Sequence, residues 1–178
     1  MRVLPVALIT TDLDSLIRRA MEQSQLTHAH PVSQLCCAAY CAWAHFLLQG
    51  ETDDAWGRAC SELTTRATGE LAPWWTRILN ELDAPPEGTG YVVDCLRSAV
   101  AANQETDYER VVRTAIALGH DTDTTACVAG GIAGIRFGYQ GIPERWRDAL
   151  RGREIVDPLA RQLVSMSGFA SKSRLMEE

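Results

Sequence analysis

The chain has 178 residues, of which 46% are hydrophobic and 22% are charged, and its net charge is −6. This composition is typical of one globular domain with a sizeable core, and it excludes an intrinsically disordered chain. The acidic balance argues against a nucleic-acid-binding protein, because such a protein needs a basic face for the phosphate backbone.

Apolar residues recur at helical spacing along the whole chain, and no stretch alternates as a strand does. After Thr10 and Thr11 the spacing predicts a half-buried helix through Met21. A helix that is apolar over most of its circumference is expected from Pro31 to Gly50. Further helices are expected at about 52–68, 74–79, 91–102, 107–118 and 122–137, and short ones after Pro143 and after Pro158.

Residues 83–90, with two prolines and two glycines, form the clearest loop, and the last ten residues are expected to fray. We therefore predict an all-α protein: a single domain over residues 1–178, arranged as an orthogonal multi-helix bundle.

The sequence carries no run of about 18 apolar residues, so neither a transmembrane helix nor a membrane partner is expected. Asp12 and Asp14 interrupt the apolar N-terminal stretch, which is therefore not expected to be a signal peptide. The six cysteines form no Cys-x-x-Cys pair and are interpreted as reduced, buried thiols. Together these features predict a cytoplasmic location.

Carboxylates and hydroxyls gather in residues 119–124 (GHDTDT), directly before a helix of small residues. The carboxylates of Asp121 and Asp123 and the hydroxyl of Thr124 are hard oxygens, the ligand type that Mg²⁺ and Mn²⁺ prefer. The same residues also suit a helix start, with Asp121 or Thr122 as the cap and Asp123 beside the positive end of the dipole. The spacing alone does not decide between these interpretations.

Glycines at positions 130, 134 and 138 recur every four residues along that helix. Such a stripe of bare backbone permits very close packing against a neighbour. A helix buried so deeply would bring its polar N-terminus into the interior or to the floor of a cleft.

Cys37, Cys41 and His45 share one helix face, and soft ligands at that spacing could hold Zn²⁺. The surrounding alanines and aromatic residues favour a core face instead.

Four segments in order resemble the ADP-ribosylglycohydrolase family. Residues 119–124, with the alanine–glycine helix and residues 141–146 (GIPERW), resemble its C-terminal signature. Upstream, residues 88–94 (GTGYVVD), 26–31 (LTHAHP) and 1–5 (MRVLP) resemble its Gly-Tyr-Val, Thr-His and Met-Arg-x-x-Pro segments. The match runs over residues 1 to about 148 and is far more specific than any one motif.

The resemblance implies a partial ADP-ribosylglycohydrolase fold and hydrolysis of a glycosidic bond between ADP-ribose and an acceptor. Asp121, Asp123 and Thr124 match positions that hold a pair of Mg²⁺ or Mn²⁺ ions, which bind the ribose hydroxyls and orient water. The expected partner is ADP-ribose or an ADP-ribosylated substrate.

The resemblance also implies a set of substrate-binding positions. Tyr91 matches an aromatic position beside the nucleotide, and His28 matches one near the pyrophosphate, although His28 also suits a helix-end partner. Gly90, Gly119 and His120 belong to the same substrate-facing segments. The family usually has glycine at position 120, so the His120 side chain is expected either to crowd the turn or to add a nitrogen ligand. Asp94 and Trp146 are expected to be structural.

The chain resembles the C-terminal half of the family. The family's catalytic glutamate, Thr-Asp-Asp metal segment and phosphate loop match no position here, so no catalytic base is assigned. Thr52-Asp53-Asp54 follows the Thr-His segment instead of preceding it, and it is interpreted as a helix cap.

Weak or absent activity is therefore expected of the chain alone. The alternative functions are a non-catalytic ADP-ribose-binding or interaction module and half of a split enzyme. In either case an exposed apolar face is expected to favour a partner chain or self-association.

Overall fold

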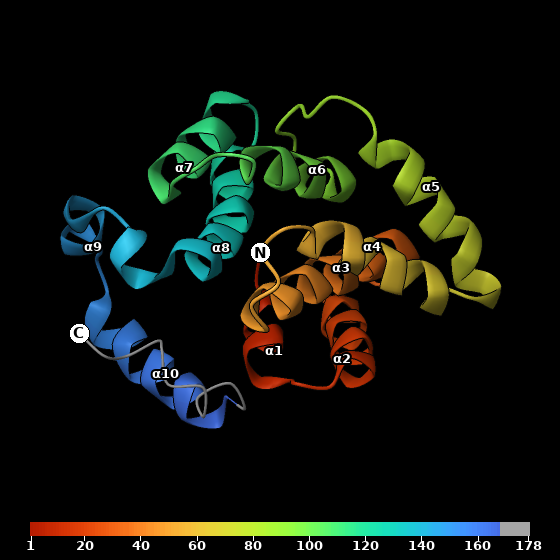
Figure 1. The fold of residues 1–178 in the computed structure, drawn as a ribbon, viewed down its shortest axis with the longest axis horizontal. Coiled ribbons are helices and arrows are strands. Elements are labelled where there is room, and N and C mark those ends of the chain that lie inside the picture. Colours follow the sequence, from red (N-terminus) through yellow and green to blue (C-terminus); the bar gives the residue numbers. More distant parts are fainter. Residues whose placement is uncertain (168–178) are drawn as a thin grey trace.

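The computed structural model describes residues 1–167, and within this range every regular element is a helix (Figure 1). In chain order these are α1 (Leu4–Ile9), α2 (Leu13–Gln25), α3 (Pro31–Leu48), α4 (Ala55–Arg66), the short 3-10 helix η1 (Gly69–Leu71), α5 (Ala72–Leu82), α6 (Val92–Ala102), α7 (Tyr108–Ala117), α8 (Thr122–Gly141), α9 (Glu144–Ala149) and α10 (Arg153–Met166). The predicted all-α class is confirmed.

Helix α3 forms the centre of the main core and packs against α1, α2, α4, α5, α6 and α8. Its alanines at 38, 39, 42 and 44 are fully buried, which lets these neighbours approach closely. Among the described helices α3 alone is long and apolar enough to cross a membrane, contrary to the expectation that no such run exists. Most of its length is buried inside the protein, as expected of a core helix.

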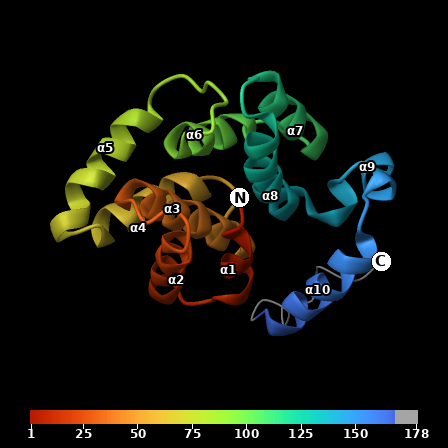
Figure 2. The ribbon, with the colours of Figure 1, turned by 180° about the vertical axis from the view of Figure 1, so that it is seen from behind.

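Helices α6, α7 and α8 form a second packed group beside α3 (Figures 1 and 2). Its small apolar cluster contains Ala99, Ala102, Val111, Ala115, Ala129 and Ala133. The two groups meet at α8, where the hydroxyl of Tyr40 on α3 donates to the carbonyl of Val128 at 2.9 Å. Helix α8 is therefore the link between the central core and the second group.

The glycines of α8 do not pack as the sequence predicted. A Cβ on Gly130 would lie 3.3 Å from the Tyr108 hydroxyl, but Gly134 and Gly138 have no atom within 4 Å of theirs. The close approach is at Gly131, where a Cβ would lie 2.5 Å from the Tyr40 hydroxyl and 2.9 Å from Leu4 Cδ2. The predicted stripe is wrong at two of its three positions, because the face of α8 that meets α3 is the one that carries Gly131.

Helix α9 packs on α7: Arg145 pairs with Glu109 at 2.5 Å, and the Trp146 and Tyr108 rings meet edge to face. This contact agrees with the structural role expected of Trp146. Helix α10 lies to one side of the other helices and packs on α1 (Figures 1 and 2). It buries no residue, and the apolar side chains of Ile155, Leu159 and Met166 are exposed.

Several helices differ from the sequence predictions. Helix α1 was not expected, and α10 begins at Arg153, so Pro158 lies inside it instead of ahead of it. A proline in the second turn removes one backbone hydrogen bond, and the helix continues beyond it. Helix α4 starts at Ala55 because the Asp54 carboxylate accepts from the Gly57 amide at 3.0 Å, which confirms Thr52-Asp53-Asp54 as a cap. The predicted fraying of the last ten residues lies outside the described residues.

Candidate functional site

The loop of residues 83–90 folds around the carboxylate of Asp94, in the first turn of α6. Asp94 Oδ1 accepts from the Glu87 amide at 2.9 Å and from Arg97 at 2.5 Å. Asp94 Oδ2 accepts from both the amide and the hydroxyl of Thr89, each at 2.6 Å. Four donors thus converge on one buried carboxylate, so the loop has a defined shape.

Burial by itself would raise the pKa of Asp94, but these hydrogen bonds outweigh it and lower the pKa to about 2. The Asp94–Arg97 ion pair is itself buried, with side-chain exposures of 4% and 11%. Arg97 also donates to the carbonyl of Glu81 at 2.7 Å, which ties the end of α5 to the same network. Asp94 therefore has the structural role expected from the sequence.

The carbonyl of Gly88 connects this loop to the start of α8. It accepts from the Asp121 amide at 2.9 Å and from the Thr125 hydroxyl at 3.4 Å, and the Gly88 amide donates to Ser98 Oγ at 3.1 Å. We refer to Asp94, Ser98, Asp121 and Thr125, with the backbone of residues 87–90, as the loop network. Its effect is to join α6, the loop and α8 through directional hydrogen bonds.

Gly90 lies directly against the side chain of Asp121. A Cβ on Gly90 would stand 2.5 Å from Asp121 Oδ2, too close for any residue but glycine without a shift of the carboxylate. The structure therefore brings together two of the predicted site residues, one from the Gly-Tyr-Val segment and one from the 119–124 segment.

Asp121, Asp123 and Thr124 lie together at the surface, in the first turn of α8. Asp123 is exposed, and Asp121 and Thr124 are partly exposed, so the helix start does not lie in the interior, the first of the two places expected for it. Hydrogen bonding with the Thr124 hydroxyl is the main cause that lowers the pKa of Asp121, and Asp123 adds to it. Although Asp121 holds the N-cap position, no side-chain hydrogen bond caps this helix.

The three side chains fit a divalent cation by the chemistry of their donors, since carboxylate and hydroxyl oxygens are the ligands that Mg²⁺ and Mn²⁺ take. Within residues 1–167 no three His, Cys, Asp or Glu side chains gather as a metal site. A cation bound at Asp121 and Asp123 would therefore complete its shell with Thr124, water, substrate or further protein.

Gly119 and His120 form the turn that leads into α8, and both have left-handed backbone, with φ of 81° and 53°. Glycine adopts this conformation freely, but a residue with a Cβ is strained there. This geometry gives a physical reason why glycine suits position 120. His120 is exposed on the turn.

Tyr91 is 46% exposed at the start of α6, one residue after Gly90. Its hydroxyl donates to Glu81 Oε2 at 2.9 Å, at the end of α5.

His28 lies in the connection between α2 and α3 and not in the loop network. Its Nδ1 is 2.8 Å from the Thr27 hydroxyl, and its carbonyl accepts from Ser24 Oγ at 3.0 Å. Arg2 donates to the same Thr27 hydroxyl at 2.6 Å. The Met-Arg and Thr-His segments thus meet, and they place a guanidinium next to an imidazole.

The face with Cys37, Cys41 and His45 belongs to the core. Cys41 is fully buried, its Sγ lies 3.6 Å from the Val3 carbonyl, and burial raises its pKa. His45 Nε2 lies 2.7 Å from Gln49 Nε2. These contacts agree with the core interpretation.

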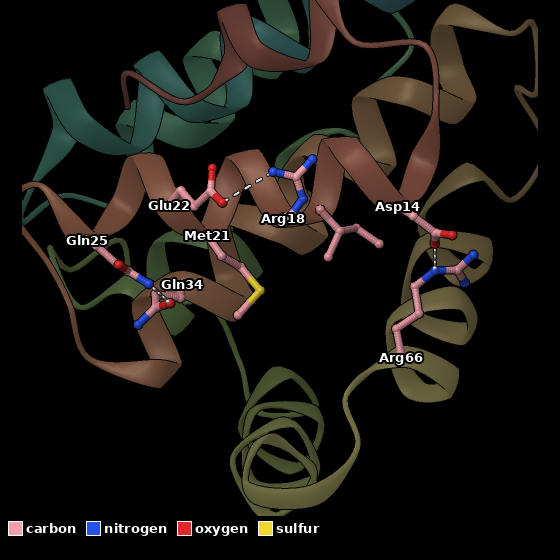
Figure 3. Close-up of a pocket in the computed structure, with 8 residues that line it drawn as sticks. Asp14, Arg18, Met21, Glu22, Gln25, Gln34 and Arg66 are labelled. Atoms are coloured by element: carbon pink, nitrogen blue, oxygen red, sulfur yellow. Dashed lines mark hydrogen bonds and ion pairs between the residues drawn. The ribbon is translucent and has the colours of Figure 1, made fainter.

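A groove of about 420 Å³ lies between α2, the start of α3 and the end of α4. Figure 3 shows that its rim is paired: Arg66 contacts Asp14 at 2.6 Å, Arg18 contacts Glu22 at 3.4 Å, and Gln25 donates to Gln34 at 3.0 Å. None of the predicted site residues lines this groove. The candidate site and the groove are therefore separate features.

Sequence reasoning missed the parts of the loop network that carry no obvious chemistry. Gly88, Ser98 and Thr125 hold the loop against α6 and α8 through one carbonyl, one amide and two hydroxyls. A weak signal was available, because an acidic residue four positions after a Gly-Thr-Gly turn can fold back onto the amides of that turn.

Comparisons with known proteins agree with the resemblance noted above. A model of the ADP-ribosylglycohydrolase family matches residues 1–172, further than the 148 residues that the motifs covered. The ADP-ribosylarginine hydrolase Tri1 of Serratia proteamaculans is 31% identical over 151 residues, which are 82% of this chain and 39% of that protein.

Two further relatives cover more of the chain. The ADP-ribosylhydrolase ARH3 of Homo sapiens is 30% identical, over 92% of this chain and 56% of its own length. The ADP-ribosyl-[dinitrogen reductase] glycohydrolase of Rhodospirillum rubrum is 28% identical, over 96% and 55%. The chain thus spans about half the length of the curated relatives that it matches.

Proposed function

Since the family model matches residues 1–172, the chain belongs to the ADP-ribosylglycohydrolase family, and on this premise we propose that it serves in the metal-dependent hydrolysis of a glycosidic bond between ADP-ribose and an acceptor. The observation that carries the proposal is the group of Asp121, Asp123 and Thr124 at the start of α8. Their oxygens lie together at the surface, and the helix start is not capped by the Asp121 side chain. The Asp121 carboxylate interacts instead with Thr124 and Asp123, so the three groups are close enough to share a cation.

In this proposal Asp121, Asp123 and Thr124 hold Mg²⁺ or Mn²⁺, two ions in the complete site, and the metal supplies Lewis-acid activation of water and of the ribose hydroxyls. Tyr91 offers an exposed ring on which adenine or ribose can stack. His28 and Arg2 are the proposed contacts of the pyrophosphate, because a guanidinium and an imidazole complement its negative charge.

The chemistry requires that a water oxygen bonds to the anomeric carbon while the bond to the acceptor nitrogen or oxygen breaks. The acceptor leaves with a proton that derives from the water, and ADP-ribose is the second product. No residue of this chain is proposed as the general base, because the family's catalytic glutamate matches no position here. We therefore expect low activity from the chain by itself.

Calorimetric titration with Mn²⁺ and ADP-ribose tests the proposal directly. The wild-type chain is expected to bind Mn²⁺, and Mn²⁺ is expected to tighten its binding of ADP-ribose. Asp121→Ala should abolish this metal dependence.

Asp54→Ala is the matched control, since it removes an aspartate from the N-cap of α4 without touching the site. It should lower stability by about 1 kcal/mol and leave Mn²⁺ binding unchanged. Equal Mn²⁺ binding by wild type and Asp121→Ala would refute the metal site.

Product release identifies the acceptor class. ADP-ribosylarginine and an O-linked ADP-ribosyl ester represent the N- and O-glycosidic substrates, and ADP-ribose released in the presence of Mg²⁺ is the product to measure. Fast turnover of either substrate by the isolated chain would refute the expectation of low activity.

A second candidate function is supported by α10, whose apolar face of Ile155, Leu159 and Met166 is exposed. Amphipathic helices with an exposed face of this kind commonly bind another protein. The chain would then act as an interaction module or as one half of a split enzyme. Sedimentation at micromolar concentrations tests self-association, and Leu159→Lys should abolish any dimer; a monomeric wild type would exclude self-association.

A further inference from the structure

Asp94 lies in α6, two helices before the proposed metal ligands of α8, and its hydrogen bonds go to Glu87, Thr89 and Arg97. We propose that Asp94 is a positioning residue for Asp121: it shapes the 87–90 loop, and that loop fixes both the backbone and the carboxylate of Asp121. This inference rests on the proposed function, because it concerns the residue that we assign as a metal ligand.

The first step of the argument is that Asp94 determines the shape of the loop. The Glu87 amide, the Thr89 amide, the Thr89 hydroxyl and the Arg97 guanidinium all donate to its two oxygens, at 2.5 to 2.9 Å. An uncharged carboxamide at this position has one acceptor oxygen, so the donors on one of the two carboxylate oxygens would lose their acceptor. Asn at position 94 is therefore nearly the same size but cannot hold the same loop.

The second step is that the loop holds Asp121 at two points. Between the two residues that Asp94 binds, Gly88 directs its carbonyl to the Asp121 amide at 2.9 Å. One residue after Thr89, Gly90 lies so close to Asp121 Oδ2 that a Cβ would come within 2.5 Å of it. A shift of this loop by a few tenths of an ångström therefore moves a ligand oxygen.

The third step is that the loop also has left-handed backbone at Gly88, with φ of 73°. A Cβ there would lie 2.6 Å from Leu118 Cβ, at the end of α7. The loop is thus confined between α6, α7 and α8, so its position is transmitted to Asp121 instead of being absorbed by a free segment.

Hydrogen exchange tests this chain of contacts without any metal. In Asp94→Asn the amide of Asp121 is expected to exchange at least about tenfold faster than in wild type. This increase should be larger than the increase in exchange rate at the slowest-exchanging amides of α3. Asp54→Ala serves as the control, because it also removes a carboxylate that binds a backbone amide, at the start of α4 and outside the loop network. In this control the exchange rate of the Asp121 amide should rise no more than the exchange rates of the α3 amides.

If the exchange rates of the Asp121 amide and of the α3 amides rise by the same factor in Asp94→Asn, then Asp94 contributes to stability alone and the positioning role is wrong. If Asp94→Asn does not fold, Thr89→Val removes one of the four donors and should shift the Asp121 amide in the same direction by a smaller factor.

The affinity for Mn²⁺ tests the consequence for the ligand. Asp94→Asn is expected to weaken Mn²⁺ binding by about tenfold, the usual effect of losing a group that orients a metal ligand. Gly90→Ala should weaken it as well, because its Cβ displaces the Asp121 carboxylate while the contacts of Asp94 remain intact.

Wild-type affinity in both variants would overturn the positioning role. If the wild-type chain itself binds no Mn²⁺, the metal site of the proposed function fails, and hydrogen exchange alone decides whether Asp94 positions Asp121. Failure of the inference and failure of the proposed function therefore give different results.

Discussion

The core around α3 and the loop network are held together by different forces. In the core, alanine, leucine and cysteine side chains are buried on all sides of α3. Their burial is favourable and roughly proportional to apolar area, without a preferred direction. In the loop network, hydrogen bonds of defined length join Asp94, Gly88 and Asp121. The core therefore supplies stability, and the loop network supplies geometry.

Helix α8 belongs to both regions and shows the difference along its own length. Its first turn carries Asp121 and lies at the surface, on the loop network. About three turns further on, Gly131 lies against Tyr40 and Leu4 in the core. A change at one end is thus expected to alter ligand placement, and a change at the other to alter stability.

The largest effect should come from the core. Leu35 is 1% exposed on α3, and Leu35→Ala is expected to lower the free energy of unfolding by about 3 kcal/mol, because apolar contacts are lost and a cavity remains. Urea unfolding measures the loss. In the variant that is still folded, Mn²⁺ affinity should equal that of wild type; a parallel loss of affinity would show that the two regions are not separable.

The contribution of the loop network to the free energy of unfolding should depend on pH in the acid range. Asp94 has a folded pKa of about 2, below the value of about 3.9 for an aspartate in an unfolded chain. Its contribution is therefore complete above about pH 4 and is lost as the pH falls toward 2, a total of about 2 kcal/mol. Urea unfolding at several pH values should show the gap between wild type and Asp94→Asn shrinking as the pH falls. A gap that stays constant with pH would contradict the assignment.

The sequence predicted the core better than it predicted the loop network. The apolar spacing of α2 and α3 identifies buried faces because it depends on one helix at a time. Two prolines and two glycines likewise identify the 83–90 loop. Helix α1 was missed because six residues are too few to show a period.

The features that the sequence could not predict are contacts that depend on how loops and helices are arranged in space. Asp94 was expected to be structural, but three of its four donors come from a loop whose course is not fixed by local preference. The glycines at 130, 134 and 138 were equivalent in the sequence, and only the packing of α3 and α1 makes their neighbour Gly131 the close contact. The roles of Asp121, Asp123 and Thr124 as metal ligands stay predictions.

A pair of alanine substitutions on α8 compares its buried and open faces. Gly131→Ala should lower the free energy of unfolding by about 2 kcal/mol, because its Cβ displaces the Tyr40 hydroxyl from its hydrogen bond with Val128. Gly134→Ala, with no atom within 4 Å, should instead raise it by up to about 1 kcal/mol through helix propensity. Thermal unfolding of both proteins measures the contrast, and equal effects would mean that the close packing at Gly131 is wrong.

The smallest expected effect is at His120, whose strained backbone lies in the turn directly before α8. His120→Gly should raise the free energy of unfolding by less than about 1 kcal/mol, because relief at φ of 53° is partly offset by the greater freedom of glycine in the unfolded chain. Measured together with Mn²⁺ affinity, this substitution separates the two roles predicted for the side chain.

If the imidazole is a nitrogen ligand, affinity falls while stability rises; if it only crowds the turn, affinity holds or improves. A loss of stability would show that His120 makes favourable contacts, and that the left-handed turn is not the reason for glycine at this position.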